Sequence, residues 1–312
     1  MRKYRYIIII LFNFFIISPS FAFLGKKDIG TTSAQFLKLG VGGQANAMGE
    51  AVTALVNDST SIYWNPSGLS SVKDKHLSLM HNFYIADIFY DYITYAQSIR
   101  KIGTFGLGIQ YVNYGSMKET DSTGSEISDF TPYDLSVAIG YAREINESFR
   151  VGLSTKYVIS KIKNTATAVA FDIGGQYYLF NDSLLLGLVA QNIGTRMKFI
   201  SEGNSLPLNI KLGVGYKLIK NSVIELDVNL PSDNTIIVGI GAQYSILIKT
   251  DFLGNGAIIP RVGYNTRSAD ILGFKGFSSG IGFSLEKYGL DYAFVPFGDL
   301  GLTHRISVFM KF

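Results

Sequence analysis

Residues 208–218, Leu-Asn-Ile-Lys-Leu-Gly-Val-Gly-Tyr-Lys-Leu, alternate strictly between a large apolar residue and a small or polar one. This two-residue period places all the large apolar side chains on one face of a strand. The same alternation dominates the chain from Thr104 onward, with clear examples in residues 104–111, 134–141, 224–230 and 236–245. The chain is therefore predicted to be all-β, with one face of its strands in an apolar environment.

Turn residues divide this region into segments of about the 9 to 11 residues that a tilted transmembrane strand needs. We count roughly 14 strands, an even number as in bacterial barrels. Short connections alternate with long polar ones such as 116–131 and 193–205, which suits periplasmic turns and outer loops. The connection 247–256 is long where a periplasmic turn is expected. The predicted strands begin near Lys75, Phe89, Gly103, Pro132, Ser148, Thr167, Ser183, Leu206, Ser222, Asn234, Ala257, Phe277, Leu290 and Leu302.

The composition also leans toward a membrane protein. Of the 312 residues, 47% are hydrophobic and 13% aromatic. Only 17% are charged, against roughly 25% in an average soluble domain. The mean hydropathy is +0.22. The chain has no cysteine, which excludes a disulfide framework, a thiolate metal site and a cysteine nucleophile.

A soluble β-sandwich would show the same alternation, so other features must favour a barrel. Strand length and tyrosines near the strand ends, where interfacial girdles place them, favour the transmembrane form. The last strand adds a further signal, because a terminal Phe312 on the lipid-facing side resembles the assembly signal that the barrel-insertion machinery reads. The predicted signal residues share one face of that strand: Ile306, Val308, Met310 and Phe312. Outer-membrane lipid is the expected surrounding.

The first 22 residues are predicted to be a signal peptide, cleaved after Ala22. Arg2, Lys3 and Arg5 precede an apolar run at 6–17, and small residues follow. An uncleaved anchor helix is the alternative, but the run is short for a span of ~20 residues. The mature chain would carry 25 basic and 24 acidic residues, so nothing in its charge favours a nucleic-acid partner.

Residues 23–72 are predicted to form an N-terminal plug, and residues 73–312 the barrel. Apolar residues between Ala45 and Leu55 recur at helical spacing among small ones, which predicts a short, slim helix. A second helical turn at 61–64 would stop at Pro66. A periplasmic extension outside the barrel is the alternative, but the small residues suit tight packing against strand walls.

The stretch from Met48 to Leu69 resembles the N-terminal signature of the PorV/PorQ family, which is similar to the FadL-type outer-membrane transporters. Residues 290–305 resemble the closing hairpin of the same family. Ser67 stands where alanine is more usual. The resemblance implies a barrel of about 14 strands with an N-terminal plug. The plug residues that carry it are Met48, Gly49, Asp58, Tyr63, Trp64, Asn65 and Pro66.

The family resemblance implies two functions. The first is that of an interaction partner in a type IX-like protein secretion or cell-surface attachment apparatus. In that case, loops 116–131 and 193–205 of the barrel would face secreted or surface proteins. The alternative is FadL-like passive transport of a hydrophobic small molecule, which needs a plug movement or a lateral opening. A third hypothesis, that the protein is an outer-membrane enzyme, has little in its favour.

No catalytic, cofactor-binding or metal site is predicted. His76, His81 and His304 lie far apart in the sequence, without a G-x-S-x-G motif or a cluster with ligand spacing. His304 is interpreted as a packing or loop-anchoring residue. The run Gly40-x-Gly42-x-x-Ala45 matches a dinucleotide fingerprint only superficially, because no βαβ pattern follows it.

Ionisable residues on the inward side of the strands are predicted to form a polar network in the lumen. Because both signs occur, internal ion pairs are favoured over the single-sign ring of a selective pore. Trp64 is expected to pack at the contact of plug and wall, with a hydrophobic-ligand contact as the alternative. At Asn65-Pro66, Pro ends the helix while the Asn side chain bonds nearby backbone. The inward residues are Asp134, Lys156, Asp172, Lys211, Lys217, Glu225, Asp227, Asp291 and Arg305.

Overall fold

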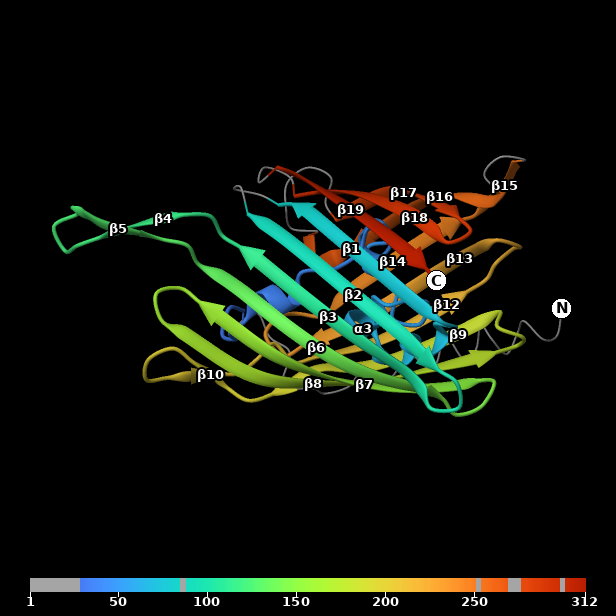
Figure 1. Cartoon of the computed structure of the whole chain (residues 1–312), viewed down its shortest axis with the longest axis horizontal. Coiled ribbons are helices and arrows are strands. Elements are labelled where there is room, and N and C mark those ends of the chain that lie inside the picture. Colours follow the sequence, from blue (N-terminus) through green and yellow to red (C-terminus); the bar gives the residue numbers. More distant parts are fainter. Residues whose placement is uncertain (1–28, 85–87, 251–253, 269–275, 298–300) are drawn as a thin grey trace.

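A computed structural model describes residues 29–84, 88–250, 254–268, 276–297 and 301–312. The signal peptide predicted for residues 1–22 lies outside these ranges. Antiparallel strands form a closed barrel of 14 strands, sealed where the first strand pairs with the last (Figure 1). The predicted all-β barrel and its strand number are confirmed.

The barrel strands all begin within a few residues of their predicted starts. They are β1 (Lys75–Phe83), β2 (Phe89–Ile99), β3 (Gly103–Asn113), β6 (Tyr133–Glu144), β7 (Phe149–Lys161), β8 (Thr165–Leu179), β9 (Leu184–Gly194), β12 (Asn209–Tyr216), β13 (Ser222–Pro231), β14 (Ile237–Tyr244) with its continuation β15 (Ile246–Thr250), β16 (Gly254–Asn265), β17 (Phe277–Leu285), β18 (Tyr288–Pro296) and β19 (Leu302–Lys311).

The two ends of the barrel differ. Short turns join the strands at one end, which we call the short-turn end. At the other, the long-loop end, two loops carry small hairpins of their own. One consists of β4 (Met117–Thr120) and β5 (Glu126–Phe130) and projects beyond the barrel (Figure 1). The other consists of β10 (Met197–Lys198) and β11 (Gly203–Asn204).

Side chains alternate between the two faces of the wall as the two-residue period predicts. Ile139 is 63% exposed on the outer face, whereas its chain neighbours Ala138 and Gly140 are buried. The last strand follows the same rule, with Ile306, Val308 and Phe312 exposed and Met310 partly so. The outer face is thus the apolar surface that a lipid bilayer requires.

In the unexpectedly long connection 247–256, the described residues 247–250 and 254–256 belong to strands and not to a loop. Ser245 interrupts β14, but the chain stays extended, and β15 pairs with the same strand, β16, that β14 pairs with. Ile246 lies opposite Ile258, and Thr250 opposite Gly254. One hairpin at the short-turn end is therefore longer than its neighbours.

Residues 29–72, which we call the lumen segment, lie inside the barrel (Figure 1). Met48, Ile62 and Trp64 are almost fully buried in one apolar core with inward wall residues. Among the described residues, no helix is long and apolar enough to cross a membrane. The segment contains only short helices: η2 (Gln35–Lys38), α2 (Gly43–Ala47), α3 (Ser61–Trp64) and η3 (Pro66–Ser71).

The helix predicted from Ala45 to Leu55 is wrong. Helix α2 ends at Ala47, and Gly49 and Glu50 then adopt positive φ angles of 64° and 62°. Beyond them, the backbone amides of residues 52–54 bond to wall carboxylates. These wall contacts replace the hydrogen bonds that a continued helix would have made.

Candidate functional site

Inward-facing glycines in many neighbouring strands let the lumen segment lie directly against the wall. A Cβ placed on Gly263 of β16 would lie 2.0 Å from the Gly49 nitrogen. One on Gly187 of β9 would lie 2.5 Å from the Thr53 carbonyl oxygen. We call these positions the glycine track, and no larger residue fits there without displacing backbone. Its glycines in closest contact with the segment's backbone are Gly152, Gly187, Gly239, Gly241 and Gly263.

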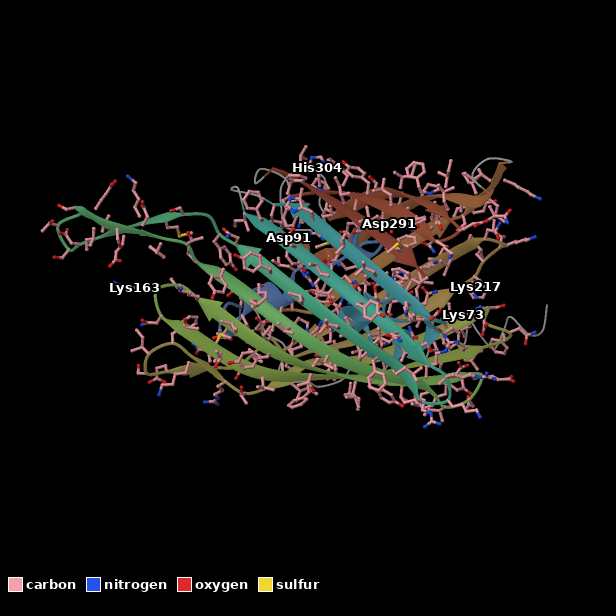
Figure 2. All side chains as sticks on the ribbon, viewed as in Figure 1. Lys73, Asp91, Lys163, Lys217, Asp291 and His304 are labelled. Atoms are coloured by element: carbon pink, nitrogen blue, oxygen red, sulfur yellow. The ribbon has the colours of Figure 1, made fainter. Side chains whose placement is uncertain are left out.

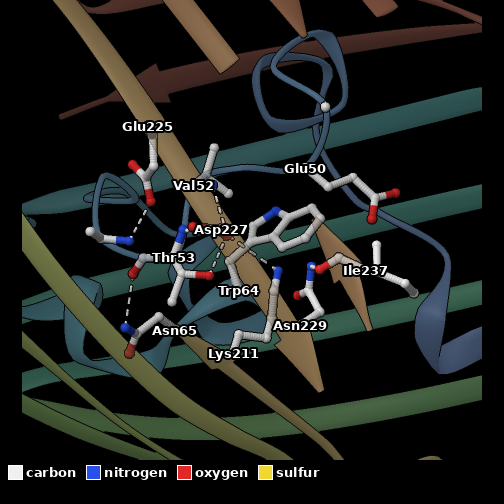
Figure 3. A network of polar contacts seen from close by, with 12 residues as sticks. Glu50, Val52, Thr53, Trp64, Asn65, Lys211, Glu225, Asp227, Asn229 and Ile237 are labelled. Atoms are coloured by element: carbon white, nitrogen blue, oxygen red, sulfur yellow. Dashed lines mark hydrogen bonds and ion pairs between the residues drawn. The ribbon is translucent and has the colours of Figure 1, made fainter. Parts of the chain in front are cut away.

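Two adjacent carboxylates on β13 bind the backbone where the predicted helix is absent (Figure 3). One Asp227 oxygen accepts hydrogen bonds from the nitrogens of Val52 and Thr53, both at 3.2 Å, and from the Thr53 hydroxyl at 2.6 Å. Glu225 accepts a bond from the Ala54 nitrogen at 2.6 Å. Both side chains are fully buried. Consecutive amides of the lumen segment are thus held by carboxyl groups of the wall.

Lys211 joins this carboxylate pair to the predicted plug motif. Its Nζ lies 3.7 Å from Asp227 and 4.5 Å from the centroid of the Trp64 ring, which is a cation–π contact. The Trp64 indole nitrogen donates to the Val41 carbonyl at 3.1 Å. The structure therefore brings four of the predicted residues together around one turn of the lumen segment.

Asn65 connects two parts of the lumen segment with the wall. Its amide nitrogen donates to the carbonyls of Thr53 at 2.9 Å and of Gly175 in β8 at 3.2 Å. Its carbonyl oxygen accepts from the nitrogen and the hydroxyl of Ser67, capping η3 just before Pro66. Ser67, which replaces the more usual alanine, therefore contributes a hydroxyl to this cap.

Uncharged wall side chains hold the rest of the segment. Gln191 of β9 donates to the Tyr63 carbonyl at 2.6 Å, and Gln110 of β3 donates to the Phe36 carbonyl at 2.9 Å. On the opposite side, Asn265 of β16 donates to the Gly49 carbonyl at 2.8 Å. The contacts thus surround the segment instead of attaching it to one side.

The remaining predicted network residues lie in separate small groups. Lys156 forms a buried ion pair with Asp172 at 2.7 Å. Asp291 pairs at 2.5 Å with Arg261, and Gly282 lies between their strands, where a Cβ would reach both side chains. Asp134 is half-buried and accepts a bond from the Tyr114 hydroxyl at 2.5 Å.

Lys217 was predicted to face the lumen, and this is wrong. It follows the last residue of β12 and is exposed at the short-turn end, whereas Lys163 lies at the opposite end of the barrel (Figure 2). The alternating pattern continues through residue 218 in the sequence, but the strand ends at Tyr216. The alternating pattern therefore made the predicted strand longer than β12, so that it included residues beyond the rim of the barrel.

A cavity of about 310 Å³ lies above the lumen segment at the long-loop end. Tyr63 and Trp64 contribute to its lining, and burial together with the Glu50 carboxylate raises the pKa of the Tyr63 hydroxyl. That hydroxyl stays protonated and donates to the carbonyls of Leu37 and Leu39. The charged residues of the lining are Lys38, Glu50, Lys211, Arg267 and Arg305.

Asp233, in the loop after β13, holds the start of the lumen segment. One of its oxygens accepts bonds from Thr32 at 2.5 Å, Gln35 at 2.8 Å and Lys38 at 2.9 Å. Partial burial works against ionisation, but these hydrogen bonds outweigh it and hold the pKa of Asp233 below its usual value. The carboxylate is therefore charged at neutral pH.

The three histidines do not form a common site. His76 is buried and bonds to Ser59, His81 bonds to Asp91 at 2.6 Å, and His304 bonds to the Tyr292 hydroxyl at 2.7 Å. In the part of the chain that the structure describes, no group of three His, Cys, Asp or Glu side chains is placed to hold a metal ion.

Sequence reasoning missed the glycine track, Arg261, Asp233 and the glutamines of the wall. The signal was present for most of them, because Gly263, Arg261 and Gln176 lie on the same inward side as the predicted charged residues. Asp233 lies in a loop, where no periodicity indicates which side chains turn inward.

The sequence was compared with models of known protein families. The family model described as "Type IX secretion system protein PorV" matches residues 24–240. The chain belongs to the PorV family. With its closed barrel fold, this membership identifies a protein of the outer membrane. Comparison with curated proteins found no significant match.

Solved structures similar to this PorV family member share its fold at low identity. The Pseudomonas putida toluene transporter TodX is 13% identical, with a TM-score of 0.56 over 86% of this chain and 96% of TodX. The Ralstonia pickettii toluene transporter TbuX is 12% identical, with a TM-score of 0.57 over 88% and 98%. A Pseudomonas aeruginosa FadL homologue is 11% identical, with a TM-score of 0.54 over 86% and 97%. The chain thus shares the barrel fold of these proteins.

Proposed function

We propose that this protein is a plugged barrel that serves as an outer-membrane interaction partner of a protein secretion or cell-surface attachment apparatus of the type IX kind. The observation that carries the proposal is the ring of contacts around the lumen segment. Carboxylates of β13, amides of β3, β8 and β9, and Asn265 of β16 all bond to it. A lumen filled in this way leaves the loops as the surface that meets other molecules.

The β4–β5 hairpin gives those loops a defined shape. Lys118 and Glu126 form an ion pair across it at 2.6 Å, and Lys163 in the neighbouring turn bonds to Glu119. Ile127 is 60% exposed and Met117 43% exposed on this hairpin. Exposed apolar residues on a projecting, braced hairpin are typical of a contact surface for another protein. We expect secreted or surface proteins to bind there.

The test is affinity purification of the tagged barrel from detergent-solubilised outer membranes, with mass spectrometry of the co-purifying proteins and extracted lipids. One variant replaces residues 117–130 by a short turn. The matched control replaces exposed Lys163 by alanine, which removes a brace but leaves the hairpin in place. Folding of each variant is checked by heat-modifiable migration.

Stoichiometric secretion or surface proteins that are lost with the hairpin and retained in the control would support the proposal. A solitary barrel in every sample would contradict it. If such a barrel also carried an extracted hydrophobic compound, transport would become the better account.

Passive transport of hydrophobic compounds is the second candidate, and the cavity favours it. Ile237, Phe277 and Phe297 give the cavity apolar lining near the long-loop end, and TodX and TbuX, which share the fold, are toluene transporters. Below the cavity, however, lies the lumen segment with its wall contacts. Liposomes containing the barrel should therefore take up toluene no faster than empty liposomes, and faster uptake would favour transport.

A further inference from the structure

The β15–β16 hairpin differs from the other connections at the short-turn end. Strand β13 begins at Ser222, which pairs with Tyr244 of β14. Just beyond this pair, the Ser245 nitrogen donates a hydrogen bond to the Asn221 carbonyl in the turn before β13. Strand β15 then continues from Ile246 to Thr250, and no strand of the described ranges pairs with it on that side. At about 3.4 Å per residue, the hairpin extends roughly 17 Å past β13. Strand β15 lies at the edge of the barrel in Figure 1.

One edge of β15 is therefore free. Its registered partners all belong to β16, from Ile258 opposite Ile246 to Gly254 opposite Thr250. Within the residues that the structure describes, no other strand pairs with β15. A free edge presents a row of unpaired backbone donors and acceptors, onto which an extended peptide can add as a further strand.

The surface beside this edge is apolar. Leu247 is 65% exposed and Ile246 46% exposed. The adjacent turn between β12 and β13 adds Leu218 at 59% and Ile219 at 62%. Acyl chains cannot satisfy the unpaired backbone groups of the edge, so lipid is a poor occupant. The combination of apolar side chains and free backbone groups fits a peptide strand.

The described charged residues beside the edge are positive. Lys217 and Lys220 flank the apolar turn, and Lys249 lies within β15, all three exposed. Two copies of this edge would bring like charges together, which disfavours self-pairing. An occupant with acidic side chains would be attracted instead.

We propose that β15 binds an extended, acidic segment of another protein as an added strand at the short-turn end, which faces the periplasm in barrels of this kind. The inference deepens the proposed interaction function and adds a second contact surface opposite the loops. The partner strand alternates apolar and acidic residues, because the edge offers apolar contacts and lysines side by side.

The test uses the purified full-length barrel in lipid nanodiscs and short fluorescent peptides. One peptide alternates valine with glutamate, and its matched control alternates valine with lysine. Anisotropy should show the glutamate peptide binding at least about tenfold more tightly, a difference of about 1.4 kcal/mol. The same glutamate peptide with every backbone nitrogen methylated should not bind, since it cannot pair with the edge.

Variants locate the contact. Lys249→Glu should weaken binding of the glutamate peptide about tenfold, whereas Lys198→Glu, an exposed lysine at the long-loop end, should leave it unchanged. The chain has no cysteine, so Leu247→Cys gives a single thiol. It should form a disulfide with a cysteine-tagged glutamate peptide, and Ile200→Cys, exposed on an outer loop, should not.

Equal binding of the two peptides, or binding that survives methylation, would overturn the inference. A Leu247→Cys barrel that preferentially forms disulfide-linked dimers would assign the edge to a second copy and overturn it as well. The peptide assay contains no secretion component and does not involve the β4–β5 hairpin. Its failure is therefore distinguishable from a failure of the proposed function.

Discussion

The wall and the lumen segment are stabilised in different ways. In the wall, β7 and β8 pair continuously from Phe149 opposite Tyr177 to Lys161 opposite Thr165, so each strand satisfies its neighbour's backbone. In the lumen segment, residues 48–58 form no helix or strand, and the amides of Val52, Thr53 and Ala54 bond to side chains far away in the sequence. The wall follows from a local pattern repeated along the chain, whereas the shape of the segment depends on single wall residues.

This difference implies that a substitution in one contact can release the segment while the barrel stays closed. Three substitutions and a change of pH test that separation, in order of the effect expected.

Asp227→Ala should have the largest effect. It leaves Lys211 buried without its carboxylate and the amides of Val52 and Thr53 without an acceptor. Removing one partner of a buried ion pair costs about 3–5 kcal/mol. Urea unfolding of the detergent-solubilised barrel should show that loss, and adding Lys211→Met should recover part of it. A change below about 0.5 kcal/mol would mean that the carboxylate does not hold the segment.

Gly263→Ala should come next. The new methyl group would meet the Gly49 backbone at 2.0 Å, so the segment must move, at a cost of about 1–3 kcal/mol. Limited proteolysis with mass spectrometry should reveal new cleavage near Met48 while heat-modifiable migration persists. Gly175→Ala is the matched control, because its Cβ would meet nothing closer than 3.6 Å. Similar proteolysis of both variants would argue against the glycine track.

Asn65→Ala should cost about 1–2 kcal/mol through the lost cap and the lost bonds to Thr53 and Gly175. Protease resistance of the lumen segment should decrease while heat-modifiable migration of the barrel persists. Asn164→Ala removes the same side chain at an exposed turn and should change neither. If Asn65→Ala left protease resistance unchanged, Asn65 would have no role in fixing the chain.

Lowering the pH should have the smallest effect, confined to the start of the segment. The pKa of Asp233 is depressed from 3.8 in the folded protein, so its contribution is complete above that value and is lost as the pH falls further. A spin label on Ser33→Cys should become more mobile only below about pH 4. Asp233→Asn should make the label mobile at every pH, and mobility independent of both would contradict the assigned contact.

Much of the wall was predictable from the sequence. Alternation at 104–111 and 134–141 gave the faces of β3 and β6, and turn residues gave the starts of the strands. The same inward parity identified Lys211, Glu225 and Asp227 as lumen residues. Their common target was not predictable, because no local pattern says which backbone amides a carboxylate will meet.

The helix predicted from Ala45 to Leu55 was wrong for a physical reason. Ala45, Ala51 and Ala54 are all buried, so small residues are needed on every side of the segment and not along one helical face. The spacing that mimics a helix reflects close approach to the wall. Arg261 was missed although its strand position places it on the inward side of the wall. Its partner Asp291 lies two strands away, so no local pattern indicated the ion pair.

The most direct test of the account is hydrogen exchange of the Val52, Thr53 and Ala54 amides in the barrel embedded in lipid nanodiscs. If the segment is held permanently by Asp227 and Glu225, these amides should exchange as slowly as those in the middle of β7 and β8, although they belong to no regular element. Exchange as fast as in the exposed β4–β5 turn would show a segment that leaves the wall readily and would contradict the account.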